Sequence, residues 1–413
     1  SLLTGLYPTE HGLWANGCDL ATEVPTLPRI LGRHGFQTAH FGKLHLEAIL
    51  RRGLTSYAYG FETCEIAEGD QQLTHDAYFL WLRRHFPDVF CQLVAEMYQE
   101  GQAKGYTSFL PEQLHLTHWV TDCAIEWLRL RRDPDRPFFL SVGYFDPHHP
   151  FNPCEPWAGR FANADVGEPF FDERSWGTRP PPYRQFFERC RGVTRNPEAI
   201  RAIRRAYHAM CAHIDHHVGR LLQTLQELRL DDRTLVIFTS DHGEFLGEHG
   251  LLWKGPYLLD DLLRVPMIIN VPGRPIAPSG GLRLDGLTSG VDLVATVQAA
   301  SGLTDLVRGS GRPFLGPDLT PFPEGPRDAV LCEWEGPDGG PFSSLRCVRT
   351  AEWKLIHNNL GLAGELYDLR ADPRESINRY AEPAYRAVRE TLREIVDQLG
   401  NRPRPSTPHS GGW

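Results

Sequence analysis

One ten-residue segment, Thr234 to Gly243, constrains the fold more than any other part of this chain. It opens with Leu235 to Phe238, a short apolar run, and continues directly into Thr-Ser-Asp-His-Gly. Such a run is typical of a strand buried on both faces of a parallel sheet. In open α/β sheets, ligands bind beyond the carboxyl ends of the strands. Asp241 and His242 therefore indicate a metal or catalytic site, although a lone Asp-His pair can also simply cap a turn.

The same pattern occurs twice more. The predicted strand 36–41 ends in Gly-Lys-Leu-His, which contains Lys43 and His45. The predicted strand 137–144 is followed by Phe-Asp-Pro-His-His-Pro-Phe, where two prolines stiffen the backbone around His148. Polar loop residues and a proline turn with incidental histidines are the alternative interpretations. Because parallel strands present their carboxyl ends at one edge, we expect all three segments to meet there.

Helical patterns separate these strands and predict an α/β fold, with a central mixed, mostly parallel sheet flanked by helices. The Pro- and Gly-rich stretch 303–327 predicts a boundary between a catalytic domain, 1–310, and a smaller domain, 311–413, with an antiparallel sheet and a closing helix. Residues 46–110 and 152–196 are weakly patterned and are predicted to wall the site. The predicted helices are 26–33, 111–132, 198–229, 292–300 and 384–399, and the further strands are 265–271, 329–334, 345–350, 353–357 and 365–369.

Composition excludes several classes of function. The net charge of −9 comes with no basic block, which argues against nucleic acid as a partner. The chain has no apolar run long enough for a membrane span. Its nine cysteines show no Cys-x-x-Cys spacing, which argues against a zinc ribbon. Only four of the 43 basic residues are lysines, and two of them, Lys43 and Lys254, lie beside the polar segments. A compact ammonium suits a point contact with an anion.

The long predicted helix 198–229 carries His208, His213, His216 and His217, of which His213 and His217 share one face. No glutamate-directed zinc pattern accompanies them. We interpret them as a packed or solvated helix face, with metal binding as the less favoured alternative.

Lysines, histidines and a carboxylate at one sheet edge predict an anion site with acid–base groups. Such a site can stabilise a transferring sulfuryl or phosphoryl group, and a histidine can protonate the leaving oxygen. The residues do not choose between sulfate and phosphate.

The sequence resembles the sulfatases of the alkaline phosphatase superfamily over nearly its whole length. The matching segments are Ser1-Leu-Leu-Thr-Gly5, Gly42-Lys-Leu-His45, Pro147-His-His-Pro-Phe151, Thr239-Ser-Asp-His-Gly243, Gly247-Glu-His-Gly250 with Lys254, and Gly364-Glu-Leu-Tyr-Asp-Leu369.

The resemblance implies an alkaline phosphatase-like fold and assigns a role to each candidate residue. Lys43 and His45 would hold and deprotonate the nucleophile, and His148 and Lys254 would contact the sulfate and assist departure of the leaving group. Asp241 and His242 would bind a divalent metal, usually calcium. The implied substrate is a small-molecule or carbohydrate sulfate ester.

The family nucleophile is a formylglycine made from the Cys of a Cys-x-Pro-Ser-Arg motif, and the chain begins just after the expected position of that motif. The nucleophile and the other metal ligands are therefore expected upstream of Ser1. We predict that residues 1–413 alone are inactive and bind metal weakly at Asp241 and His242. The alternatives are a phosphonate monoester or phosphodiester hydrolase, for which manganese or zinc would replace calcium, and a catalytically inactive binding protein.

Overall fold

The computed structural model describes residues 1–14, 18–47, 59–69, 75–100, 105–273, 281–303, 309–336, 342–362 and 364–400. The chain divides into two compact units. Unit 1 comprises residues 1–26, 169–191 and 235–413, and unit 2 comprises residues 27–168 and 192–234. Among the helices of the described residues, none is long and apolar enough to cross a membrane.

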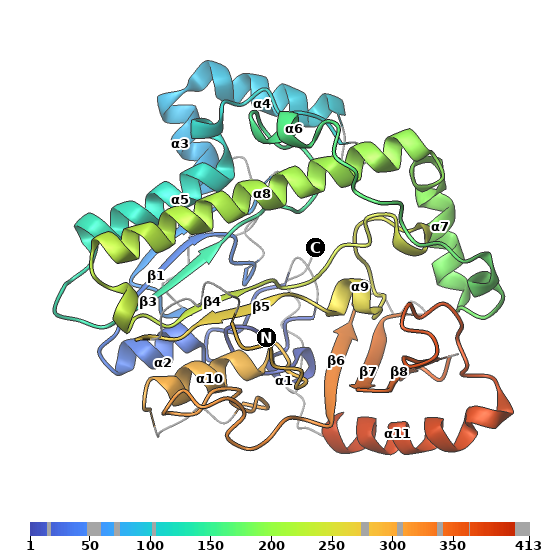
Figure 1. Ribbon diagram of the computed structural model, residues 1–413. Helices are drawn as coiled ribbons and strands as arrows, with labels where there is room; N and C mark the ends of the chain where they lie inside the picture. The colour runs from blue at the N-terminus through green and yellow to red at the C-terminus, as the bar shows by residue number, and fades with distance from the viewer. Residues whose placement is uncertain are drawn as a thin grey trace. The chain divides into compact units, whose positions relative to one another are not determined.

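Unit 2 is built on a parallel three-stranded sheet in the order β2-β1-β3 (Figure 1). The strands are β1 (Gln37–Gly42), β2 (Thr63–Ile66) and β3 (Phe138–Gly143). Every residue of the central strand β1 is buried, as expected for a strand covered on both faces. The predicted strand at 137–144 exists but is half-buried along its length.

Helices pack around this sheet. The long α8 (Pro197–Glu227) lies beside α5 (Leu116–Glu126), and α6 (Trp157–Phe161) also packs on α8 (Figure 1). Asn196 caps α8 by accepting hydrogen bonds from the backbone of its first turn, and Pro197 follows as the first helical residue. The other elements of unit 2 are α2 (Leu27–Arg33), α3 (Ala77–His85), α4 (Pro87–Glu100), η2 (Glu112–Leu114), the π-helical turn η3 (Trp127–Arg131) and η5 (Asp231–Arg233).

In unit 1 the organising strand β4 (Val236–Thr239) pairs with β5 (Met267–Asn270), and the pairing is antiparallel. The prediction of parallel pairing for this segment is therefore wrong, because its partner among the described residues runs antiparallel. The predicted burial on both faces is also wrong, since β4 is only half-buried. Alternation cannot separate parallel from antiparallel partners in so short an apolar run. Unit 1 also contains α1 (Pro8–His11), η4 (Glu173–Gly177), η6 (Glu248–Gly250), α9 (Asp260–Leu263) and α10 (Asp292–Ala300).

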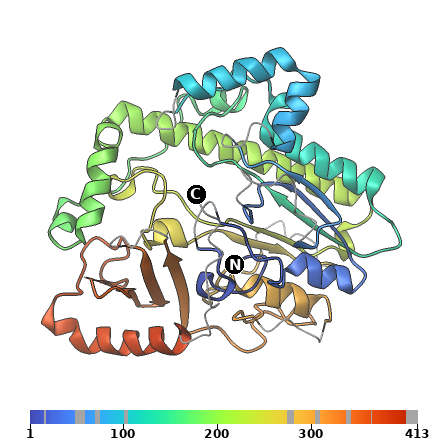
Figure 2. The ribbon, with the colours of Figure 1, turned by 180° about the vertical axis from the view of Figure 1, so that it is seen from behind.

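The C-terminal part of unit 1 matches the prediction of an antiparallel sheet closed by a helix. The sheet has the order β6-β7-β8-β9, and α11 (Arg386–Gly400) runs along it (Figure 2). Leu392 and Val396 of α11 pack on Val348 and Leu355 of the sheet. The strands are β6 (Ala329–Glu335), β7 (Ser344–Thr350), β8 (Trp353–Asn358) and β9 (Glu365–Asp368), and η7 (Pro383–Tyr385) precedes the helix.

The stretches predicted as irregular walls contain more regular structure than expected. Residues 46–110 include β2, α3 and α4, although 48–58, 70–74 and 101–104 lie outside the described residues. Residues 152–196 include α6 and α7 (Pro181–Thr194). The helix α7 was not predicted because it begins with two prolines, which usually indicate irregular structure. Proline is nevertheless well tolerated in the first turn of a helix. The boundary at 310/311 stays a prediction.

Candidate active site

Lys43 and His45 follow β1, and His148 lies five residues beyond β3 in the same sheet of unit 2. Gly42 pairs with Gly143 at the ends of these parallel strands, and the Lys43 amide donates a hydrogen bond to the Gly143 carbonyl at 2.8 Å. A Cβ on Gly42 would stand 2.0 Å from that carbonyl oxygen. The two glycines thus allow the strand ends to approach closely, and the predicted meeting of these two segments at one edge is confirmed.

The side chain of Glu68 fixes the turn that carries His45. Its Oε1 accepts hydrogen bonds from the backbone amides of Leu44 (2.9 Å) and His45 (2.6 Å), and its Oε2 lies 2.9 Å from His45 Nδ1. His45 also has a left-handed φ of 56°, which these bonds help to hold. Burial of Glu68 opposes its ionisation, but the hydrogen bonds from His45 keep the pKa of Glu68 below its ordinary value.

Behind Glu68 lies a second buried carboxyl group, Asp76. Asp76 Oδ2 accepts a hydrogen bond from the Glu68 amide at 2.7 Å, and Oδ1 accepts one from Phe79, so that Asp76 also caps α3. Burial raises the pKa of Asp76 to about 7. Asp76, Glu68 and His45 therefore form a chain of groups that runs from the core of unit 2 to the half-exposed imidazole.

The ring of His148 is oriented by its neighbours. Its Nδ1 lies 2.6 Å from the His149 carbonyl oxygen, so Nδ1 must carry a hydrogen and donate it. The neutral ring then has its lone pair on Nε2. His148 stacks on His149 at 4.1 Å and packs against Phe145 at 4.8 Å between ring centroids. The Asp146–Pro147 and His149–Pro150 peptide bonds are both cis.

Unit 1 holds the other predicted residues, Asp241, His242 and Lys254. Lys254 Nζ donates to His242 Nε2 at 2.9 Å, while His242 Nδ1 donates to the Gly243 carbonyl at 2.8 Å. Asp241 Oδ1 accepts from the His242 amide at 3.0 Å, and the side chain is 48% exposed. The loop thus brings Lys254, one of the four lysines of the chain, into direct contact with the histidine of the Asp-His pair.

The fit of Asp241 and His242 to a metal is incomplete. Asp241 Oδ2 and His242 Nε2 are 3.8 Å apart, but among the described residues no third His, Cys, Asp or Glu converges on them within 4.8 Å. The His242 nitrogen that could bind a cation faces the Lys254 ammonium instead. The pair alone is therefore not a metal centre.

The sequence reasoning missed Glu68 and Asp76. Glu68 follows β2 by two residues, which is the same signal that singled out the other strand ends. It was hidden because residues 46–110 were taken as one unpatterned wall. Asp76 had the ordinary signature of a helix cap, an Asp directly before an apolar helical run.

Lys354, another of the sparingly used lysines, has a structural role in unit 1. It is fully buried and forms ion pairs with Asp260 and, at 2.5 Å, with Glu375, and it donates to the Leu258 carbonyl at 3.2 Å. Burial opposes its charge, but the two carboxylates raise the pKa of Lys354 above its ordinary value. The rarity of lysine in this chain therefore does not by itself mark a catalytic residue, because Lys354 is held in a buried ionic cluster.

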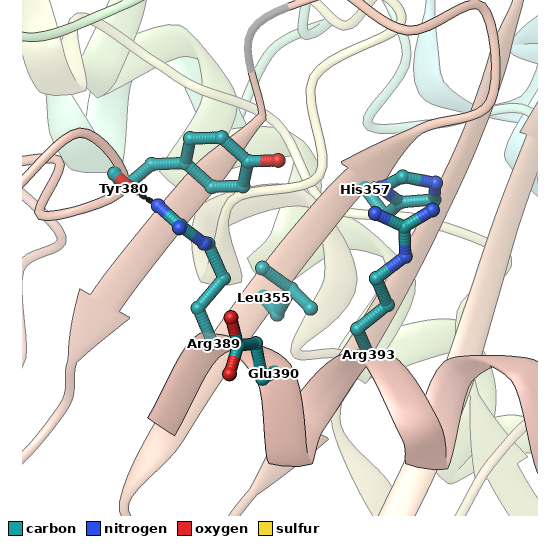
Figure 3. A pocket seen from close by; sticks show the side chains of 6 residues that line it. All are labelled: Leu355, His357, Tyr380, Arg389, Glu390 and Arg393. Atoms are coloured by element: carbon teal, nitrogen blue, oxygen red, sulfur yellow. Dashed lines mark hydrogen bonds between the residues drawn. The ribbon is translucent and has the colours of Figure 1, made fainter. Parts of the chain in front are cut away.

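A cavity of about 230 Å³ lies between β8 and α11 in unit 1 (Figure 3). Its lining residues are Leu355, His357, Tyr380, Arg389, Glu390 and Arg393. None of the predicted site residues lines it, and Arg389 donates to the Tyr380 carbonyl. It has no evident connection to the chemistry of the strand ends.

Comparisons with known proteins agree on one family. Among curated proteins, the choline-sulfatase of Rhizobium meliloti is 28% identical, and the alignment covers 96% of this chain and 75% of the choline-sulfatase. The arylsulfatase of Clostridium perfringens is 26% identical, and the alignment covers 96% of this chain and 82% of the arylsulfatase. The solved structure of the phosphonate monoester hydrolase of Agrobacterium radiobacter is 25% identical in sequence and has a TM-score of 0.77. The superposition covers 97% of this chain and 84% of the hydrolase.

The family models give the same answer. The model described as sulfatase matches residues 1–303, and the model for the C-terminal part of N-sulphoglucosamine sulphohydrolase matches residues 247–402. The α/β fold with its C-terminal antiparallel sheet is the alkaline phosphatase-like fold predicted from the sequence. The chain belongs to the sulfatase family.

Proposed function

We propose that this protein hydrolyses small-molecule or carbohydrate sulfate esters, with Lys43, His45, His148 and Lys254 as its catalytic residues. The observation that carries the proposal is the match of the sulfatase model to a range that includes all four residues. The orientation of their side chains supports it, because each imidazole is held through Nδ1.

The roles follow from charge and proton position. A sulfuryl group in transfer spreads negative charge over its oxygens, and the ammonium groups of Lys43 and Lys254 can stabilise that charge. His148 donates through Nδ1 to a backbone carbonyl, so Nε2 is the atom that would carry a proton to the leaving oxygen. His45, held by Glu68, would take the proton of the attacking hydroxyl group. That nucleophile would be the formylglycine of the family.

We propose Glu68 as a positioning residue for His45. Its carboxylate contacts both the imidazole and the backbone of the turn, so its loss would affect catalysis without removing a reacting group. We expect Glu68→Gln to lower kcat by ~10²-fold with little change in KM, as for a misplaced catalytic group. Glu62→Gln is the control, since that side chain pairs with Arg136 at the surface.

A divalent cation, calcium in the leading proposal, would be held by Asp241 and His242 with further ligands and would supply neutralising charge to the sulfate oxygens. His242 would have to exchange its contact with Lys254 for the cation. A calcium titration followed by the imidazole NMR signals tests this, and unchanged His242 signals would count against a ligand role.

The deciding experiment compares an aryl sulfate with an aryl phosphonate as substrates of the full-length protein. We expect faster turnover of the sulfate, and a ~10²–10⁴-fold loss in His148→Gln. The control is His34→Gln, which removes an exposed imidazole. Turnover of neither ester would contradict the proposal.

A second candidate, phosphonate monoester hydrolysis, is favoured by the TM-score of 0.77 to a hydrolase of that class. Much faster turnover of the phosphonate than of the sulfate would establish it in place of the first.

A further inference from the structure

A buried cluster of soft metal-type ligands lies in unit 2, apart from the residues assigned above. His115, Cys154 and His213 each offer a ligand atom, and these atoms lie within 4.8 Å of one another. A second group, Glu112, His213 and His217, satisfies the same condition and shares His213.

Four segments bring the cluster together. Glu112 belongs to η2, His115 caps α5, and Cys154 precedes α6. His213 and His217 are one turn apart on α8, which packs on both α5 and α6. The sequence interpretation of a packed helix face is confirmed for these two histidines, since both are fully buried. Their convergence with residues about 60 and 100 positions away was not visible in local spacing.

The hydrogen-bonding groups of this cluster are not all satisfied, as they would be in an ordinary protein core. His213 Nε2 and His217 Nε2 face each other at 2.9 Å, and Glu112 Oε1 lies 3.9 Å from both. His213 Nδ1 is buried and has no hydrogen-bond partner within the described residues. A buried polar nitrogen without a partner costs free energy, so such an atom calls for an explanation.

We propose that His115, Cys154 and His213 bind a divalent transition metal of the zinc type, with the fourth position left to water. Imidazole and thiolate are the ligands that zinc prefers, whereas calcium and magnesium require oxygen. Binding forms a metal–sulfur bond and breaks the Cys154 S–H bond, and the proton leaves to solvent.

The proposed site is structural. It would tie the start of α5, the segment before α6 and helix α8 into one body, and Trp157, stacked on His213 at 5.3 Å, closes it on one side. Its ligands differ in kind from Asp241 and His242, so the two proposals can fail independently.

The test uses cobalt as a probe for zinc in the full chain. After treatment with a chelator, equimolar Co²⁺ should give a thiolate-to-cobalt charge-transfer band that equimolar Zn²⁺ abolishes. Cys154→Ser should remove the band, and His213→Gln should weaken Zn²⁺ binding by at least about tenfold. Cys64→Ser, which alters a buried thiol of β2, should leave the band unchanged.

Two further variants separate the outcomes. Asp241→Asn should keep the band, because that residue belongs to the other proposed metal site. His115→Gln should likewise weaken Zn²⁺ binding, which keeps the proposal testable even if the Cys154 variant does not fold. Absence of the band in the native chain, or its persistence in a folded Cys154→Ser protein, would overturn the proposal.

Discussion

Replacing Lys354 by methionine should unfold unit 1 far more readily than its single charge suggests. The change removes the ammonium group but leaves Asp260 and Glu375 in place. Asp260 keeps Arg349 at 3.4 Å as a partner, whereas Glu375, with a side chain 2% exposed, loses the one cationic side chain that it pairs with among the described residues. Breaking a buried ion pair on one side costs ~3–5 kcal/mol, and we expect a loss in that range.

Urea denaturation measures the effect. With a slope of ~3 kcal/mol per molar urea, the midpoint of the transition that includes unit 1 should fall by ~1–2 M. The matched control is Arg370→Ala, which removes an exposed pair with Glu352 and should cost under about 1 kcal/mol. The double variant Lys354→Met/Glu375→Gln should recover part of the loss, because it also removes the unpaired buried charge.

The loss of stability in Lys354→Met should depend on pH. Burial raises the pKa of Glu375 even in the native protein. In Lys354→Met the carboxyl group can take up a proton in the folded state, so stability is retained below the ordinary pKa and lost as the pH rises. The deficit should therefore be larger at neutral than at acidic pH. A loss of less than about 1 kcal/mol at neutral pH, equal to that of the exposed pair, would refute the reasoning.

The remaining predictions concern unit 2. Gly42→Ala should cost at least ~3 kcal/mol by thermal denaturation, because its Cβ would meet the Gly143 carbonyl oxygen, whereas Gly35→Ala, also at positive φ but with nothing within 4 Å, should cost only ~1–2 kcal/mol. Equal losses would show that φ and not the clash decides. For Asp76, the folded-state pKa of about 7 means that stability present below pH ~4 is lost as the pH rises toward 7. Asp76→Asn should remove that slope, and an unchanged slope would contradict the assignment.

The sequence by itself determined where the strands end and which side chains follow them. Short apolar runs closed by glycine, lysine and histidine are a local signal, because strand propensity and side-chain chemistry are both encoded within ten residues. For that reason Lys43, His45 and His148 appear at neighbouring strand ends as predicted. The antiparallel C-terminal sheet and its closing helix were also predicted correctly from the local sequence pattern.

Tertiary structure decided what depends on distant partners. The antiparallel pairing of β4, the carboxylate of Glu68 behind His45, and the ion pairs of Lys354 each join segments that local pattern cannot connect. The histidines of α8 show this most clearly. Their spacing fixed only that two imidazoles share a helix face, and folding placed Cys154 and Glu112 against them. Long-range packing brings such ligands together, and no periodicity in the sequence records it.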